Sequence, residues 1–286
     1  MTELSSFTCA HDGERLSGVY GGPVAGPGVP AVVLLHGAGP GTKERLLPLL
    51  ADVAARGCHG LAFEFSGHGE STGEQKELSL RRRLEQAVAV IDARVPADAP
   101  LVVVGFSMSG QTAADVVAHY GERVAAVGLC APAVYAAEAW DVPFGSGDGR
   151  FSEIIRRPGG WRGAPALDVL RAYAGRAVLA VPETDTVIPA EVTGAVRDAL
   201  SARSRFTRFD VRGAEHMLGC GSRRTRRTAG RSWTPSWTTG RSRRGRTPEA
   251  PPGRPAYRST VRRGVIRPAP PRSPPPRSPR PAWCGR

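Results

Sequence analysis

Three side chains of this sequence have the types and the order that nucleophilic acyl chemistry requires, namely Ser107, Asp185 and His216. A serine hydroxyl becomes a nucleophile when its oxygen is exposed beside a base and near N–H groups that donate hydrogen bonds to the developing oxyanion. An imidazole supplies the base, and a carboxylate orients the imidazole and stabilises its charged form. The order serine, acid, histidine along the chain therefore predicts a catalytic triad.

Ser107 follows an apolar stretch that is typical of a buried strand. Residues 101–104 are Leu-Val-Val-Val, and they run into the small residues around Gly105 and Ser107 before a helical pattern begins. A strand that turns sharply into a helix, with a serine on the turn, is a nucleophile elbow. The elbow exposes the hydroxyl and supplies one N–H for the oxyanion, which we expect from Met108. Taken alone, a serine in this setting is often only a turn residue.

The acid and the histidine each follow a predicted strand. Asp185 competes with Glu183, which is two residues nearer the strand, and with Asp210, which we place inside a strand. His216 has no competitor, because no other histidine follows position 119. Both loops lie at the carboxyl ends of strands, where the loops of an open α/β sheet converge on a crevice.

These loops must be positioned by alternating strands and helices. After an opening β-hairpin around Asp12, the hydrophobic periodicity predicts an α/β fold with a mostly parallel sheet and helices on both faces. One apolar stripe of the longest helix, which includes Leu84 and Val88, is expected to face the core. The predicted strands are residues 31–35, 61–65, 101–104, 124–130, 177–181 and 206–211. The predicted helices lie between Thr42 and Gly57, over about 78–95, after the elbow as far as Gly121, and over about 189–200.

Residues 131–170 interrupt the alternation, and we interpret them as a short lid over the carboxyl ends of the strands. The segment contains Trp140, Phe144 and Trp161, which either line an acyl pocket or pack the lid against the core. No charged cluster in the lid indicates a particular head group. The sequence therefore leaves open the substrate, the choice between hydrolysis and acyl transfer, and the oligomeric state.

Five short motifs together resemble those of the α/β-hydrolases, in particular the small esterase-like members with a short cap. The resemblance covers roughly residues 5–220 and implies that fold for a domain of residues 1–220. It also implies that the N–H of Ala38 joins that of Met108 in the oxyanion hole. The motifs are His36-Gly-Ala-Gly39, Gly67-His-Gly-Glu-Ser71, Gly105-Phe-Ser-Met-Ser109, Asp185-Thr-Val-Ile-Pro189 and Gly213-Ala-Glu-His216.

The resemblance implies a carboxylesterase-like serine hydrolase that cleaves a small ester, thioester or related acyl compound through an acyl-enzyme, without a metal or cofactor. The alternative is a catalytically inactive protein of the same fold, either because loss of the last helix disables it or because it serves as a binding module. Three residues depart from the family pattern, since Ser66 replaces a basic residue and Ser109 and Pro182 replace glycine. We expect His36 and His68 to hydrogen-bond the backbone in their turns.

The charges divide the chain into two parts. Residues 1–220 carry 21 basic and 25 acidic side chains, whereas residues 221–286 carry 18 arginines and one acidic residue. The mildly acidic first part gives no reason to expect nucleic-acid binding. Five scattered cysteines without paired spacing argue against a disulfide framework and a zinc site. Without a signal-peptide pattern or a run of about 18 apolar residues, a soluble cytoplasmic protein that does not enter the membrane is expected.

Residues 221–286 are rich in arginine and proline and poor in large apolar side chains, so we predict that they are disordered. In the resembled family a last helix follows the histidine loop, and this sequence lacks it. We hypothesise that the segment is translated in the wrong frame of a GC-rich gene; resequencing downstream of the His216 codon tests this, and an unchanged frame refutes it. The alternative is nucleic-acid binding, with arginines on phosphates and Trp233, Trp237 and Tyr257 stacked on bases.

Overall fold

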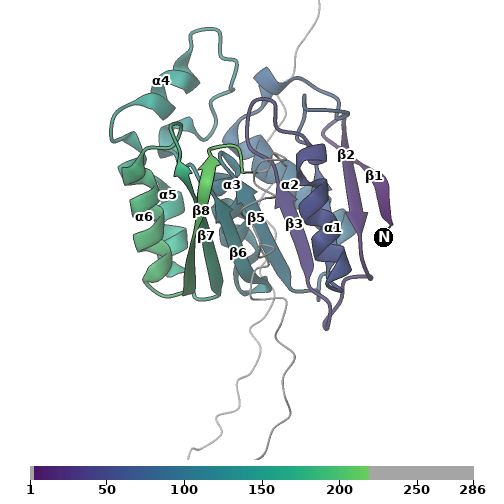
Figure 1. Cartoon of the computed structure of the whole chain (residues 1–286). Coiled ribbons are helices and arrows are strands. Elements are labelled where there is room, and N and C mark those ends of the chain that lie inside the picture. Colours follow the sequence, from purple (N-terminus) through teal and green to yellow (C-terminus); the bar gives the residue numbers. More distant parts are fainter. Residues whose placement is uncertain (1–2, 219–286) are drawn as a thin grey trace, which may run out of the picture. The chain divides into compact units, whose positions relative to one another are not determined.

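The computed structural model describes residues 3–218, so the predictions for residues 221–286 lie outside the described part of the chain. The strands are β1 (Leu4–His11), β2 (Glu14–Gly21), β3 (Ala31–Leu35), β4 (His59–Phe63), β5 (Leu101–Phe106), β6 (Val124–Cys130), β7 (Arg176–Thr184) and β8 (Arg205–Glu215). They form one eight-stranded sheet in the order β1-β2-β4-β3-β5-β6-β7-β8 (Figure 1).

The sheet opens with the predicted hairpin and continues in parallel. β1 and β2 pair antiparallel around Asp12 and Gly13, whose φ angles of 47° and 75° are those of a tight hairpin turn. β2 also pairs antiparallel with β4, and every later pair of neighbours is parallel. Parallel neighbours need long crossover connections, which the intervening helices provide.

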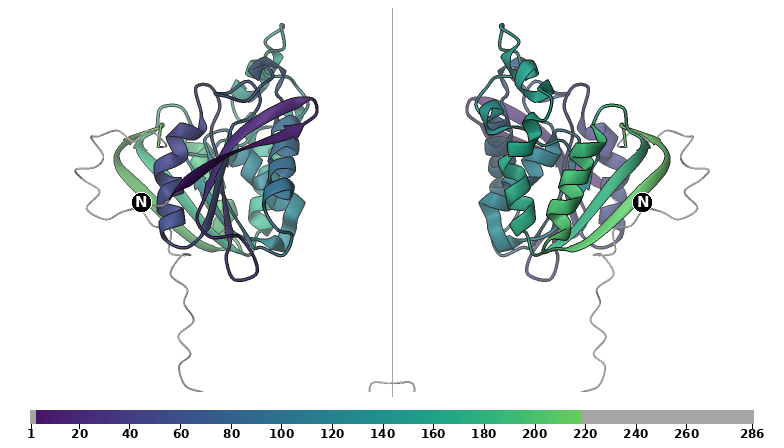
Figure 2. Two further views of the ribbon diagram at one scale, coloured as in Figure 1. Left: turned by 90° about the vertical axis from the view of Figure 1, so that its right-hand side faces the viewer. Right: turned by 90° about the vertical axis from the view of Figure 1, so that its left-hand side faces the viewer.

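Helices cover both faces of the sheet, as predicted. The helices outside the lid are α1 (Leu47–Ala55), α2 (Leu80–Arg94), α3 (Ser109–Tyr120), α5 (Pro165–Ala172) and α6 (Ala190–Ser201). α1 packs against β2 and β4 on one face, and the other four form a layer on the opposite face (Figure 2). Alternation along β3 divides the core accordingly, because Val32 and Leu34 pack with Leu50 of α1, whereas Val33 and Leu35 face the other layer.

β4 ends at Phe63, two residues earlier than predicted. The next two residues make other contacts, although the N–H of Glu64 still donates to the carbonyl oxygen of Ser17 in β2 at 2.9 Å. The carboxylate of the fully buried Glu64 accepts a hydrogen bond of 2.9 Å from Nζ of Lys43, and the N–H of Phe65 donates to Nε2 of His36 at 3.1 Å. These bonds tie the end of β4 to the turn that follows β3.

α2 shows where the sequence reading was wrong in part. Leu84 and Val88 are only half-buried, whereas Arg83 and Gln86 are fully buried on the inner face of the helix. Hydropathy assigns such polar residues to the solvent side. Their burial depends on hydrogen-bond partners from other elements, which the periodicity of one helix does not reveal.

The lid lies beyond the carboxyl ends of the strands and carries α4 (Arg150–Arg156), which Figure 1 shows above the sheet. α5 begins inside the range predicted for the lid, 131–170, but packs against α3 and α6 in the helical layer. The lid proper therefore ends near residue 164, before α5 begins. Over residues 3–218, no helix has the length and apolar character needed to cross a membrane.

Candidate active site

Ser107 lies on the turn between β5 and α3, with a φ angle of 52° that serine rarely adopts. Its N–H donates to the carbonyl oxygen of Cys130, and its own carbonyl oxygen accepts from the N–H of Ala133, each at 2.9 Å. Gly105 permits the turn, because a Cβ at this position would overlap with a carbonyl oxygen in the first turn of α3. The surrounding backbone thus holds the strained conformation in which the hydroxyl is presented.

The three predicted triad residues meet at the carboxyl ends of β5, β7 and β8. Nε2 of His216 lies 2.9 Å from Oγ of Ser107, and Nδ1 of His216 lies 3.0 Å from Oδ2 of Asp185. An ionised carboxylate can only accept, so Nδ1 carries the proton and Nε2 is left to accept the proton of the serine hydroxyl. The side chains of His216 and Asp185 are only 12% and 9% exposed, which limits competition from water.

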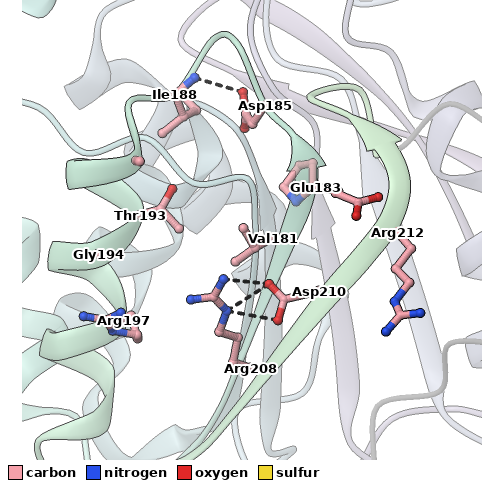
Figure 3. A pocket seen from close by; sticks show the side chains of 12 residues that line it. Val181, Glu183, Asp185, Ile188, Thr193, Gly194, Arg197, Arg208, Asp210 and Arg212 are labelled. Carbon is pink, nitrogen blue, oxygen red and sulfur yellow. Dashed lines mark hydrogen bonds and ion pairs between the residues drawn. The ribbon is translucent and has the colours of Figure 1, made fainter.

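Backbone N–H groups hold Asp185 in its charged form. Its Oδ1 accepts hydrogen bonds from the N–H groups of Val187 at 2.8 Å and Ile188 at 3.0 Å; Figure 3 shows the second. Burial raises the pKa of Asp185, but the hydrogen bond with His216 and these two backbone bonds outweigh burial and lower the pKa below its usual value. Asp185 is therefore ionised at neutral pH and suited to stabilise an imidazolium.

Figure 3 shows Asp185 apart from its two competitors, Glu183 on β7 and Asp210 on β8. Glu183 accepts a hydrogen bond of 2.6 Å from the N–H of Gly213, and Asp210 forms an ion pair of 2.7 Å with Arg208. Within the described residues, Asp185 is the carboxylate hydrogen-bonded to the imidazole of the candidate triad. The geometry therefore favours Asp185, the acid preferred from the sequence, over its two competitors.

Two backbone donors are available beside the hydroxyl. Ala38 and Met108 line one cleft with Ser107, and neither of their N–H groups has an acceptor among residues 3–218. The turn that carries Ala38 lies against the elbow, since a Cβ on Gly37 would stand 3.1 Å from the Cβ of Ser107. Free backbone N–H groups beside the nucleophile are the donors that an oxyanion hole needs, so Ala38 and Met108 remain its candidates.

His36 and His68 have structural surroundings. Nδ1 of His36 donates to the carbonyl oxygen of Gly37 at 2.7 Å, while its Nε2 accepts from the backbone after β4. Burial, with the charge of Arg83 added, lowers the pKa of His36 well below its usual value, so the ring is neutral. Nδ1 of His68 lies 3.0 Å from the carbonyl oxygen of Ser66. Both rings therefore fix turns.

Arg83 and Ser109 form a buried polar cluster that sequence reasoning missed. Nη2 of Arg83 donates to the carbonyl oxygen of His36 at 2.8 Å and to Oγ of Ser109 at 2.7 Å, and that Oγ donates to the same carbonyl at 2.6 Å. The guanidinium also stacks on the ring of Phe65, 3.7 Å from its centroid. Burial lowers the pKa of Arg83 to about 9, which still leaves the side chain charged at neutral pH.

Two cavities meet at Ser107. The first, here named the lid cleft, has a volume of about 780 Å³ and extends from Ala38 and Met108 under the lid to the start of α6. The second, the apolar pocket, has about 280 Å³ and lies between the turn after β3 and the residues around His216. The hydroxyl therefore stands between a large compartment and a small one, which fits a substrate with two unequal parts.

The lid aromatics divide between the cleft and the interior of the lid. Trp161 lines the lid cleft, as one of the two sequence alternatives proposed. Trp140 and Phe144 line neither cavity and pack in an apolar cluster of the lid, where the rings of Phe144 and Phe151 are 4.5 Å apart. Tyr135 lines the cleft instead, and no motif marked it. Trp161 thus follows the first of the two alternatives, a place in the pocket, and Trp140 and Phe144 follow the second, packing of the lid.

A family model described as serine aminopeptidase, S33, matches residues 28–154 of the chain. The matched stretch contains the turn with Ala38 and the elbow with Ser107, and it ends before Asp185 and His216. No curated protein matches the chain in sequence.

Several solved structures share this architecture. The thioesterase domain from the curacin biosynthetic pathway aligns with a TM-score of 0.61 at 15% identity, over 79% of this chain and 98% of that chain. Est1E from Butyrivibrio proteoclasticus, solved with ferulic acid, aligns with a TM-score of 0.56 at 16% identity, over 73% and 90%. An esterase from Pyrococcus furiosus aligns with a TM-score of 0.54 at 18% identity, over 75% and 84%. At these identities the likeness is one of fold.

Proposed function

This chain has the α/β-hydrolase fold, and we propose that it is a serine hydrolase of carboxylesterase-like type, which cleaves a small ester, thioester or related acyl compound. The observation that carries the proposal is the continuous hydrogen-bonded series from Ser107 through His216 to Asp185, at 2.9 and 3.0 Å. The esterases and the thioesterase among the similar structures support this general class.

In the proposed reaction, Oγ of Ser107 attacks the acyl carbonyl carbon while Nε2 of His216 accepts the hydroxyl proton. The tetrahedral oxyanion accepts hydrogen bonds from the N–H groups of Ala38 and Met108, and Asp185 stabilises the imidazolium. When the intermediate collapses, the bond to the leaving group breaks and His216 returns the proton to that group. An acyl group is left on Ser107. Water then attacks this ester with the same proton transfers, which releases the acid and restores the serine.

A fluorophosphonate probe tests the proposal without knowledge of the substrate, because the probe reacts with activated serines. We expect stoichiometric labelling of the wild type and no labelling of Ser107→Ala. Ser201→Ala serves as the matched control, since Ser201 is an exposed serine at the end of α6 and should not affect labelling. Circular dichroism establishes that each sample is folded. A folded wild type that does not label contradicts the proposal and favours the inactive binding module.

Pre-steady-state kinetics separate hydrolysis from transfer to another acceptor. With para-nitrophenyl acetate, acylation of Ser107 releases one equivalent of nitrophenol as a burst. A steady release after the burst is expected if water is the acceptor. A burst without steady turnover would show that the acyl-enzyme forms but that water is not its acceptor.

A further inference from the structure

The lid cleft is positively charged where the lid borders it. Arg156, Arg157 and Arg162 line the cleft, and Glu191, in the first turn of α6, is the acidic residue among the lining side chains beyond the candidate triad. The acidic side chains of the lid lie outside the cleft; they are Glu138, Asp141, Asp148 and Glu153. The sequence showed no such charge cluster, because residues 131–170 as a whole contain both signs. In the folded chain three of the four lid arginines line the cleft, and Arg150 does not.

Two of these arginines have no acidic partner. Nη1 of Arg157 pairs with Oε2 of Glu138 at 3.1 Å, so its charge is partly compensated. Over residues 3–218, no carboxylate lies within ion-pair distance of Arg156 or Arg162. Their guanidinium groups remain available to a ligand in the cleft.

The position of Arg162 is held by its neighbours. The guanidinium carbon lies 5.0 Å from the centroid of the Trp161 ring, which favours a cation on that face. Nη1 also lies against Gly159, where a Cβ would overlap with it, and Gly159 has a φ angle of 71°. Stacking and the absence of a side chain at Gly159 thus orient Arg162 in advance, which reduces the entropy lost when a ligand binds.

We propose that Arg156 and Arg162 bind an anionic group of the substrate, so that the enzyme prefers acyl compounds that carry a carboxylate or phosphate in the lid cleft. The inference rests on the proposed serine hydrolase function and names its substrate class. Guanidinium groups suit such anions because they donate two parallel hydrogen bonds to a pair of oxygens. Residues 1–220 carry more acidic than basic side chains, so within this part of the chain the lid arginines form a local positive region.

Matched ester pairs measure the preference. The first pair places the charge in the acyl group, and consists of the para-nitrophenyl monoester of glutaric acid and the ester in which an isopropyl group replaces the free carboxylate. The second pair places the charge in the leaving group, and consists of para-acetoxybenzoate and para-isopropylphenyl acetate. We expect kcat/KM to favour the charged member of at least one pair, and the pair concerned shows which part of the substrate occupies the lid cleft.

The variants are Arg156→Gln, Arg162→Gln and the double variant. Arg150→Gln is the matched control, because Arg150 is an exposed arginine of the same helix as Arg156 and does not line the cleft. We expect the charged-to-neutral ratio of kcat/KM to fall at least about tenfold in the double variant, as for loss of a charged hydrogen bond, and to stay unchanged in Arg150→Gln. Added salt should reduce the ratio in the wild type, since it screens the attraction.

Fluorophosphonate labelling keeps the two proposals apart. If the wild type and the double variant both label but their charged-to-neutral ratios are the same for both ester pairs, the anion site is refuted and the hydrolase proposal stands. A fall of equal size in Arg150→Gln refutes the site as well, because general charge would then explain the preference. A folded wild type that does not label overturns the hydrolase proposal and the inference together.

Discussion

Replacing Ser109 with alanine should destabilise the fold, although the resembled family has glycine at this position. The lost Oγ is fully buried, accepts from the charged guanidinium of Arg83 at 2.7 Å and donates to the carbonyl oxygen of His36 at 2.6 Å. A hydrogen bond to a charged group contributes about 1.5 to 3 kcal/mol. The better helix propensity of alanine offsets about 0.5 kcal/mol, which leaves a net loss of about 1 to 2.5 kcal/mol.

Urea unfolding of the Ser107→Ala and Ser109→Ala variants, compared with wild type, measures this loss. Ser107 is the matched control because its hydroxyl lines the cleft and, among residues 3–218, hydrogen-bonds only with His216. We therefore expect its removal to change the free energy of unfolding by less than about 1 kcal/mol. Ser109→Gly should be less stable than Ser109→Ala by up to about 1 kcal/mol, since glycine costs more backbone entropy in a helix.

The result that would refute this reasoning is a Ser109→Ala protein with wild-type stability and a wild-type rate of fluorophosphonate labelling. It would mean that the carbonyl of His36, which keeps its hydrogen bond of 2.8 Å from Arg83, holds the turn before Ala38 without help. A loss of labelling without a loss of stability would instead place Ser109 among the positioning residues of the oxyanion turn.

Three further predictions concern the acid, a buried carboxyl and the elbow. Asp185→Asn should lower kcat by about four orders of magnitude because the amide disturbs the histidine tautomer, whereas Asp210→Asn should keep kcat within a few-fold of wild type. Burial raises the pKa of Asp115 to about 7. Between about pH 4 and 7 the folded state therefore holds more protons than the unfolded state, and the free energy of unfolding falls by up to about 4 kcal/mol as the pH rises. Asp115→Asn should remove this slope in urea unfolding measured from pH 4 to 8, and an unchanged slope would assign it to other groups. Gly105→Ala should unfold the protein or lower its stability by more than about 3 kcal/mol, since the new Cβ would overlap with main-chain atoms. Gly128→Ala is the control, because the nearest atom to its Cβ would be 3.4 Å away, and thermal unfolding should show a loss of no more than about 1 kcal/mol.

The sequence predicted those features that depend on a few neighbouring residues. The elbow was recognisable because the apolar strand before Ser107 and the small residues after it are contiguous. The acid and histidine loops followed from the order of strands, since consecutive parallel strands bring their carboxyl ends to one edge. Asp185 was preferred to Glu183 from the sequence, and the structure adds the contacts that distinguish them, since Asp185 lies 3.0 Å from His216 whereas Glu183 accepts from the N–H of Gly213.

Features that depend on several distant elements could not be predicted from the sequence. Arg83 stands in a run of three arginines on α2, and only the carbonyl oxygen of His36 and the hydroxyl of Ser109, which come from two other segments, make its burial favourable. The positive charge of the lid cleft likewise depends on residues that folding brings together. Arg156 and Arg162 are separated by turns of the lid, and hydropathy does not distinguish them from solvent-facing arginines such as Arg150.

In the candidate triad, Ser107 is attached to a central strand of the sheet, whereas His216 is attached to an edge strand. Ser107 lies beside β5, a central strand paired with β3 and β6. His216 directly follows β8, which ends the described sheet, pairs only with β7 and exposes most of its residues, including Phe209 at 41%. Edge strands with few buried contacts open at lower free energy than central ones. In rising urea we therefore expect labelling of Ser107 to be lost before the circular dichroism signal changes, because displacement of His216 removes the base while the central strands and the elbow remain folded.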